Sequence, residues 1–193
     1  ANGYIGSSFL RSSDGGVNWS LSSKGIDLTT CRQIEFVGDS MMLALTNDGL
    51  ARTMNRGGQW SYLLTSRDGV DPGYPNLCAL NTDTFMVTIE GRLRLTRNGG
   101  NTFVDINPSM SALPAEKCFI DPQTKRIIYS TFYDQYVSDN LGVTWVKNPA
   151  ALMLIVAHPS GKLFGVDIKG SGKVLISSDH ANTWQDVTPN LFI

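Results

Sequence analysis

Apolar and polar residues alternate along most of the chain, in short runs that end at Gly, Asn, Asp or Pro. A period of two places successive side chains on opposite faces, which is the pattern of a β-strand. One set of four runs, read as strands A to D of an antiparallel unit, occupies 32–37, 41–46, 50–54 and 59–64. Similar sets lie within 77–106, 117–147 and 152–187. The pattern predicts an all-β protein.

A motif on the template Ser/Thr-x-Asp/Asn-x-Gly-x-x-Trp recurs five times, and every tryptophan of the chain occupies its last position. We call each copy a box; the boxes are Ser12–Trp19, Thr53–Trp60, Thr96–Phe103, Ser138–Trp145 and Ser177–Trp184. Only Phe103 and Ala181 depart from the template. The Asp or Asn positions lie 41, 43, 42 and 39 residues apart, so the boxes mark a repeat.

Each box suits a tight hairpin between strands C and D. A short acceptor side chain can bond backbone N–H groups of its own turn, glycine allows a positive φ, and the aromatic ring can pack between sheets. The residues expected to fill these structural roles are Asp14, Trp19, Asn55, Trp60, Asn98, Phe103, Asn140, Trp145, Asp179 and Trp184.

Four-stranded units that repeat about every 40 residues are typical of the blades of a β-propeller. We therefore expect one propeller domain over 1–193, either a closed ring of about five blades or an arc of a larger propeller. The first unit has no room for a strand A ahead of its box, and 191–193 follow the last box where such a strand would begin. The two ends of the chain are thus expected to be able to share a blade.

The boxes resemble the Asp-box, or bacterial neuraminidase repeat, of sialidases, other glycoside hydrolases, sorting-receptor ectodomains, photosystem assembly factors and microbial or viral surface proteins. The resemblance covers the whole chain and implies a propeller in which the boxes are structural and lie at the blade periphery. A sialidase would also need an arginine cluster, a Tyr–Glu pair, an acidic Asp and an Arg-Ile-Pro-type segment. The sequence has no such segment, so no catalytic residue is carried over from that family.

Charge and composition narrow the range of partners. The 16 basic and 17 acidic residues nearly cancel, and no run of like charge could follow a phosphate backbone or an anionic membrane surface. The longest apolar run, 150–157, is far shorter than the roughly 20 residues of a membrane helix. We expect no nucleic acid, no membrane insertion, no cofactor and no metal, and a secreted or surface location is favoured.

The candidate ligand-binding residues lie in connections between strands. The connection 66–75 is longer than its counterparts and contains Arg67, Asp68, Asp71 and Tyr74. Long loops on a rigid scaffold often carry function, and these side chains could hold sugar hydroxyls or a carboxylate while the tyrosine ring stacks, although an ordinary solvated loop would have the same composition. Turn residues complete the candidate set: Arg92, Tyr133 and Asp134. By contrast, Arg11 and Arg52 occupy the same place in two repeats, which favours a structural role.

The leading hypothesis is a non-catalytic recognition module that binds a glycan or a protein on one propeller face, as part of a surface or virion attachment protein. A fragment or minimal form of a glycoside hydrolase and a structural or assembly scaffold are the alternatives. An enzyme of that class needs two carboxylates within about 10 Å in a cleft. A glycan binder should repeat shallow pockets with aromatic floors, and a scaffold should expose a contiguous apolar or charged patch.

Overall fold

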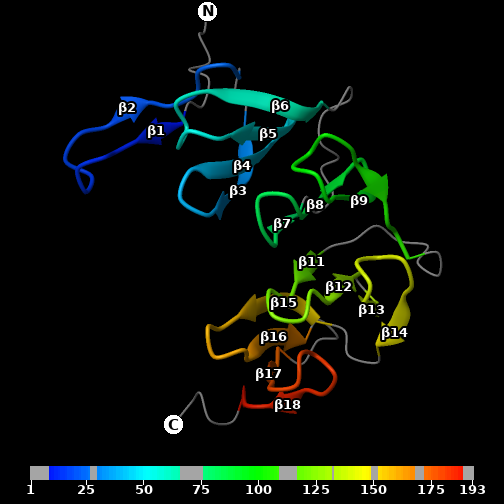
Figure 1. Cartoon of the computed structure of the whole chain (residues 1–193). Helices are drawn as coiled ribbons and strands as arrows, with labels where there is room; N and C mark the ends of the chain where they lie inside the picture. Colours follow the sequence, from blue (N-terminus) through cyan, green and yellow to red (C-terminus); the bar gives the residue numbers. More distant parts are fainter. Residues whose placement is uncertain are drawn as a thin grey trace, which may run out of the picture. The chain divides into compact units, whose positions relative to one another are not determined.

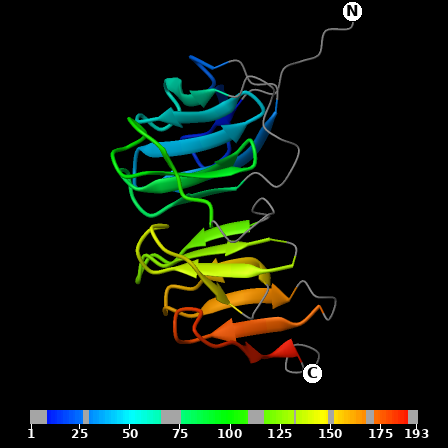
Figure 2. The same ribbon diagram turned by 90° about the vertical axis from the view of Figure 1, so that its right-hand side faces the viewer.

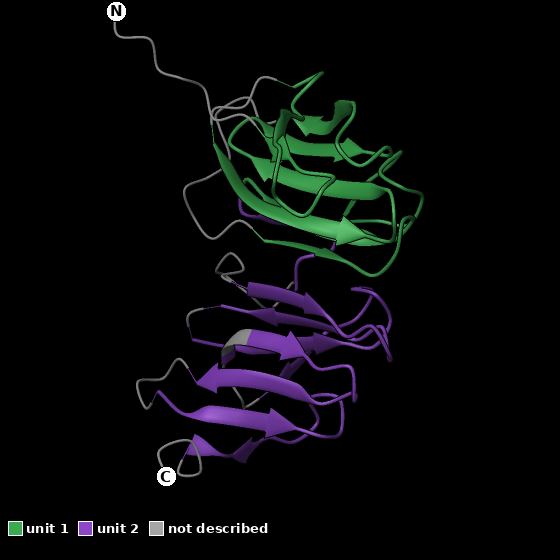
Figure 3. Ribbon diagram, turned by 90° about the vertical axis from the view of Figure 1, so that its left-hand side faces the viewer, with its two compact units in different colours: residues 1–90, 94–104 green, residues 91–93, 105–193 purple. Residues whose placement is uncertain are grey.

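The computed structural model describes residues 9–26, 30–65, 76–108, 117–131, 133–148, 152–167 and 172–188. It has two compact units, which are treated separately below: unit 1 holds 1–90 and 94–104, and unit 2 holds 91–93 and 105–193 (Figure 3). Throughout the described residues the sheets are antiparallel and no α-helix is found. The predicted fold class, an all-β chain of propeller blades, is confirmed.

We number the blades 1 to 5 after their boxes (Figure 1). Blade 1 contains two strands, β1 (Leu10–Arg11) and β2 (Ser20–Leu21). Blade 2 contains β3 (Cys31–Val37), β4 (Met41–Thr46), β5 (Gly49–Thr53) and β6 (Trp60–Thr65), in that order across the sheet. Blade 3 contains β7 (Leu77–Ala79), β8 (Phe85–Ile89), β9 (Arg92–Thr96) and β10 (Val104–Asp105).

Unit 2 contains two complete four-stranded sheets, whose strands follow one another in sequence order (Figure 2). Blade 4 contains β11 (Lys117–Ile120), β12 (Ile127–Ser130), β13 (Gln135–Ser138) and β14 (Val146–Asn148). Blade 5 contains β15 (Leu152–Ala157), β16 (Leu163–Asp167), β17 (Val174–Ser177) and β18 (Gln185–Asp186). In blade 2, where individual strands were predicted, every boundary falls within one residue of the observed strand.

The core lies between the faces of successive blades. In unit 1, Val37, Leu43 and Leu45 of blade 2 belong to one buried cluster with Leu77 and Phe85 of blade 3. The other face of blade 2 carries a second cluster, which includes Ala44, Ala51 and Trp60. Blade 2 is therefore apolar on both faces, as a sheet covered on both sides must be. In unit 2, a comparable cluster joins the facing sides of blades 4 and 5.

A recurring contact ties the boxes of blades 2 to 5 to a residue that follows the preceding box. The residue eight places after the Asp or Asn of one box meets the residue two places after the Asp or Asn of the next. The pairs are Ser22 with Gly57 and Leu63 with Gly100 in unit 1, and Ile106 with Gly142 and Asn148 with Ala181 in unit 2. The box residue of each pair has a positive φ, a conformation that favours glycine. Ala181 is the exception in this position.

We expect Gly100→Ala to destabilise unit 1 more than Gly16→Ala does. Both glycines have a φ of about +90° (+90° and +94°), so both substitutions cost roughly 1 kcal/mol of backbone strain. A Cβ at Gly100 would also lie 2.6 Å from Leu63 Cδ1, whereas at Gly16 the nearest atom is 3.8 Å away. Chemical denaturation should show an additional loss of ~1–3 kcal/mol for Gly100→Ala. Equal losses for the two variants would contradict this packing role.

Candidate functional site

The five boxes share one hydrogen-bond scheme. The Asp or Asn side-chain oxygen accepts a bond from the backbone N–H four residues later, at 2.8–3.0 Å. The Ser or Thr hydroxyl at the start of the box accepts a bond from the N–H of the residue four places on, at 2.7–3.0 Å. The turn is thus held by two side-chain acceptors, both from the N-terminal half of the box, which bind amides of its C-terminal half.

The last residue of the box packs against its surroundings to different degrees. Trp60 is buried, donates from Nε1 to the carbonyl of Ser22 at 2.6 Å and lies 5.0 Å, ring centroid to ring centroid, from Phe9. Phe103 meets the edge of a buried phenylalanine, and Trp145 does the same with a buried tyrosine. In blade 1, by contrast, Trp19 is 61% exposed.

Three arginines each donate a hydrogen bond to a backbone carbonyl of the following box. Arg11 donates to the carbonyl of Arg56 at 2.8 Å, and Arg52 donates to the carbonyl of Gly99. In unit 2, Arg126 donates to the carbonyl of His180 at 2.8 Å. Each acceptor is the residue after the Asp or Asn of the following box. The structural interpretation of Arg11 and Arg52 from the sequence agrees with these contacts.

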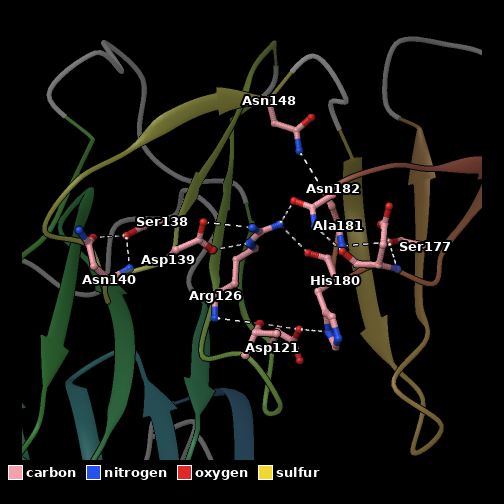
Figure 4. Close-up of polar contacts among 12 residues, drawn as sticks. Asp121, Arg126, Ser138, Asp139, Asn140, Asn148, Ser177, His180, Ala181 and Asn182 are labelled. Carbon is pink, nitrogen blue, oxygen red and sulfur yellow. Dashed lines mark hydrogen bonds and ion pairs between the residues drawn. The ribbon is translucent and has the colours of Figure 1, made fainter.

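Arg126 is the centre of a polar network that the sequence did not predict (Figure 4). Its side chain is only 13% exposed, and it binds both carboxylate oxygens of Asp139, at 2.5 and 3.0 Å, and the side chain of Asn182 at 2.7 Å. The network ties the hairpin between β11 and β12 to the box of blade 5. Arginine suits this position because its planar fork can satisfy several acceptors at once.

A second contact, also in Figure 4, joins the same two hairpins: His180 Nδ1 lies 2.7 Å from Asp121 Oδ2. Asp121 is buried, which by itself disfavours its charged form. Hydrogen bonds from the amide of Gln123, the hydroxyl of Thr124 and His180 outweigh that effect and hold the pKa of Asp121 below its usual range. The histidine therefore takes part in the contact between blades 4 and 5.

The residues predicted to bind a ligand are not brought into one site by any contact observed here. Arg67, Asp68, Asp71 and Tyr74 lie outside the described residues. Arg92 pairs with Asp105 at 2.7 Å, and Asp134 pairs with Lys147 at 2.8 Å, so each finds a partner within its own blade. Tyr133 is exposed at the turn between β12 and β13. Ligand binding by this set stays a prediction.

Unit 1 contains a groove of about 280 Å³ between β1 and the nearby face of blade 2. Its lining is mostly apolar and combines residues of both blades: Phe9, Leu10, Ile34, Phe36, Met41, Met42 and Trp60. Phe36 is 74% exposed, Leu10 57% and Ile34 39%. The polar part of the lining includes Arg11, Asp39 and Arg56. No sequence pattern predicts this groove, because its lining residues come from separate strands.

The described residues offer little for metal or acid chemistry. No group of three or more His, Cys, Asp or Glu side chains in this part of the chain is arranged to hold a metal ion. Glu35 on β3 is the carboxyl group of interest, because burial raises its pKa despite hydrogen bonds with Ala79 and Gln33. Nor does the described structure contain a helix of the length and apolarity that a membrane crossing requires.

No protein-family model and no curated protein matches the chain. Solved structures do. YCF48 bound to a D1 peptide is 15% identical, with a TM-score of 0.61 over 83% of this chain and 56% of its own. The GH74 xyloglucanase from Xanthomonas campestris is 12% identical, with a TM-score of 0.62 over 89% of this chain and 33% of its own.

A protein of a nidogen–laminin complex is 12% identical, with a TM-score of 0.59 over 82% of this chain and 64% of its own. The chain thus spans less than two thirds of the length of each of these structures. At such identities the likeness concerns the fold alone, and it supports the β-propeller assigned from the blades.

We expect Arg126→Ala to lower the free energy of unfolding by ~1.5–3 kcal/mol, because several acceptors lose a charged donor that is largely shielded from water. Arg92→Ala is the matched control: its ion pair with Asp105 is exposed, and its loss should cost less than ~1 kcal/mol. Urea denaturation of both variants measures the difference. Similar losses would show that the Arg126 network contributes no more than a surface ion pair.

The box carboxylate of Asp179 should make stability depend on pH. Hydrogen bonds from the Thr183 side chain and amide lower its pKa from 3.8 to about 2. Since the folded pKa is the lower one, the ionised carboxylate stabilises the fold above pH 3.8, and this contribution disappears as the pH falls towards 2. The Asp179→Asn variant should therefore lose less stability between pH 5 and pH 2 than the natural chain.

The reverse change, Asn140→Asp, is the control, because Asn140 accepts the same backbone bond in blade 4. It should add pH dependence in the same window. Denaturant titrations at several pH values measure both slopes, and unchanged slopes would show that the box carboxylate has an ordinary pKa.

Proposed function

We propose that this chain is a non-catalytic recognition module, built on a propeller of the Asp-box type, that binds a polypeptide partner. The observation that carries the proposal is the unit 1 groove, where Leu10, Ile34 and Phe36 are exposed beside the buried Trp60. Contiguous exposed apolar side chains are typical of protein-binding surfaces. A secreted or surface location and a role in attachment belong to the same proposal.

The lining favours a polypeptide over a glycan. A glycan presents hydroxyl groups that need several convergent polar partners, whereas most lining residues of the groove are apolar. Aromatic and aliphatic side chains of a protein partner would instead bury apolar area there, worth about 25 cal/mol per Å² before the costs of association. The loop 66–75 and the residues Arg92, Tyr133 and Asp134 remain candidates for a separate glycan contact.

A minimal glycoside hydrolase is the second candidate, because GH74 enzymes share the fold and because Glu35 has a raised pKa of the kind that suits a general acid. The chemistry needs a second carboxylate near the first. Under this alternative, Glu35→Gln would abolish hydrolysis of a fluorogenic sugar substrate. An assembly scaffold would use the apolar groove in the same way as the recognition module.

The proposal is tested by offering one preparation of the chain a displayed peptide library, a glycan array, and fluorogenic sialosides and xylosides. We expect selected peptides to bind and Phe36→Asp to weaken that binding at least tenfold. Phe164→Asp is the matched control, since it changes an exposed phenylalanine on β16 of unit 2. Glycan binding that ignores Phe36→Asp, or turnover of either substrate, would overturn the proposal.

A further inference from the structure

Gly99, the residue after the asparagine in the box of blade 3, is not required by the space around it. A Cβ at this position would have its nearest neighbours at 3.6 Å, an ordinary van der Waals distance. Glycine relieves strain at the φ of +67°, but other boxes hold a side chain in the same place: Arg56, Leu141 and His180 have φ between +54° and +58°. The fold thus accepts other residues after the Asp or Asn, and the distinctive property of Gly99 is chemical.

An asparagine followed by glycine is prone to intramolecular deamidation, because no side chain hinders the approach of the glycine nitrogen to the asparagine Cγ. The chain has this pair at 2–3 and at 98–99, and the structure describes the second. The Gly99 nitrogen loses its proton to hydroxide and bonds to Cγ of Asn98. The Cγ–Nδ2 bond then breaks, and Nδ2 takes a proton from water and leaves as ammonia. Water opens the resulting succinimide to an aspartate, or to an isoaspartate whose main chain runs through Cβ and Cγ.

The box activates the Asn98 side chain for this reaction. Its Oδ1 accepts hydrogen bonds from the Thr96 hydroxyl and from the Thr102 N–H, both at 3.0 Å. Two donors on one carbonyl oxygen stabilise the negative charge that develops there when a nucleophile adds to the carbon, as in an oxyanion hole. Asn55 and Asn140 have equivalent donors at 2.8–3.0 Å, but an arginine and a leucine follow them. Only box 3 combines this activation with a glycine nitrogen.

Two contacts hold the backbone of Gly99 in place. Its N–H donates to the carbonyl of Asp83, in the turn between β7 and β8, at 2.9 Å, and its carbonyl accepts from Arg52 of blade 2. The nitrogen can attack only after its N–H has left the Asp83 carbonyl. The reaction therefore requires a local opening of the hairpin, which costs less free energy than global unfolding.

The box of blade 1 shows how the fold holds the aspartate product. Its sequence Asp14-Gly15-Gly16 is the one that deamidation would create in box 3. Asp14 Oδ1 accepts from the Ser12 hydroxyl at 2.7 Å and from the Asn18 N–H at 2.9 Å, which is the scheme of Asn98. Hydrogen bonds, that of the Asn18 amide first, lower the pKa of Asp14 to about 2, so this carboxylate is ionised at neutral pH.

The second side-chain atom also has a place in the product. Asn98 Nδ2 donates to the Thr102 hydroxyl at 2.9 Å, whereas in box 5 the Thr183 hydroxyl donates to Asp179 Oδ2 at 2.6 Å. Deamidation would therefore only reverse the direction of one hydrogen bond. An isoaspartate, by contrast, inserts an extra carbon into the main chain and moves its carboxylate away from the Thr102 amide.

We propose that Asn98–Gly99 is a site of spontaneous deamidation and that the box keeps the aspartate product folded. The hairpin between β9 and β10 would thereby gain a negative charge as the protein ages, and the local opening at Asp83 and Arg52 would set the rate. This inference does not depend on a binding role for the chain.

The test is incubation of the whole chain in a mildly alkaline, non-denaturing buffer, followed by peptide mapping that separates the asparagine, aspartate and isoaspartate forms by chromatography and mass. We expect Asn98 to deamidate at least tenfold faster than Asn55 and Asn140. Gly99→Arg, which copies box 2, should slow the reaction at least tenfold. Arg52→Ala should accelerate it, whereas Arg92→Ala, which removes an exposed ion pair of the same blade, should not.

The Asn98→Asp variant tests the fate of the product separately. It should keep the circular dichroism spectrum and the denaturation midpoint of the natural chain at neutral pH. Equal rates at the three box asparagines, a rate that ignores Gly99→Arg, or deamidation only in denaturant would overturn the proposal. An Asn98→Asp variant that fails to fold would also overturn it, because the box would then not accept the carboxylate.

Discussion

The stacking of blades within each unit depends on apolar faces that cover one another. A sheet with alternating side chains buries one face against a neighbour, and a sheet between two neighbours must be apolar on both. Blade 2 meets this condition with Leu43 and Leu45 on one face and Ala44 and Ala51 on the other. The hydrophobic effect drives the stacking of blades within a unit. Strand positions that face a neighbouring blade therefore carry apolar residues.

Hydrophobic contact alone does not set the position of one blade relative to the next, because apolar surfaces slide without losing much area. The boxes supply the directional part. Each presents a backbone carbonyl beside its Asp or Asn, and in three blades an arginine of the preceding blade binds that carbonyl. The recurring contact two places on adds a steric limit in blades 2, 3 and 4, since a Cβ at Gly57, Gly100 or Gly142 would meet the residue before it in the pair. Together the arginine contacts and this steric limit position the hairpins.

The sequence predicted the features that depend on residues close together along the chain. Period-two alternation located the strands of blade 2 to within one residue, and box spacing located the repeat, because both depend on neighbours along the chain. Arg11 and Arg52 were recognised through their shared place before the box. Arg126 was not, because it reaches the equivalent carbonyl from the hairpin between β11 and β12, and only the fold brings it to His180. The groove could not be predicted either, because its residues come from separate strands.

The groove shows how one pattern can serve two purposes. Leu77 and Ile34 occupy corresponding places and have nearly the same apolar character, yet one is a core residue and the other lines an open surface. The residue type does not determine whether the side chain is buried or exposed. That depends on whether other residues of the fold cover it. A repeat fold therefore provides a recognition surface where apolar side chains of a blade stay exposed. In this chain the inference of a binding role accordingly rests on the exposed apolar side chains of the groove, which the fold gathers from separate strands.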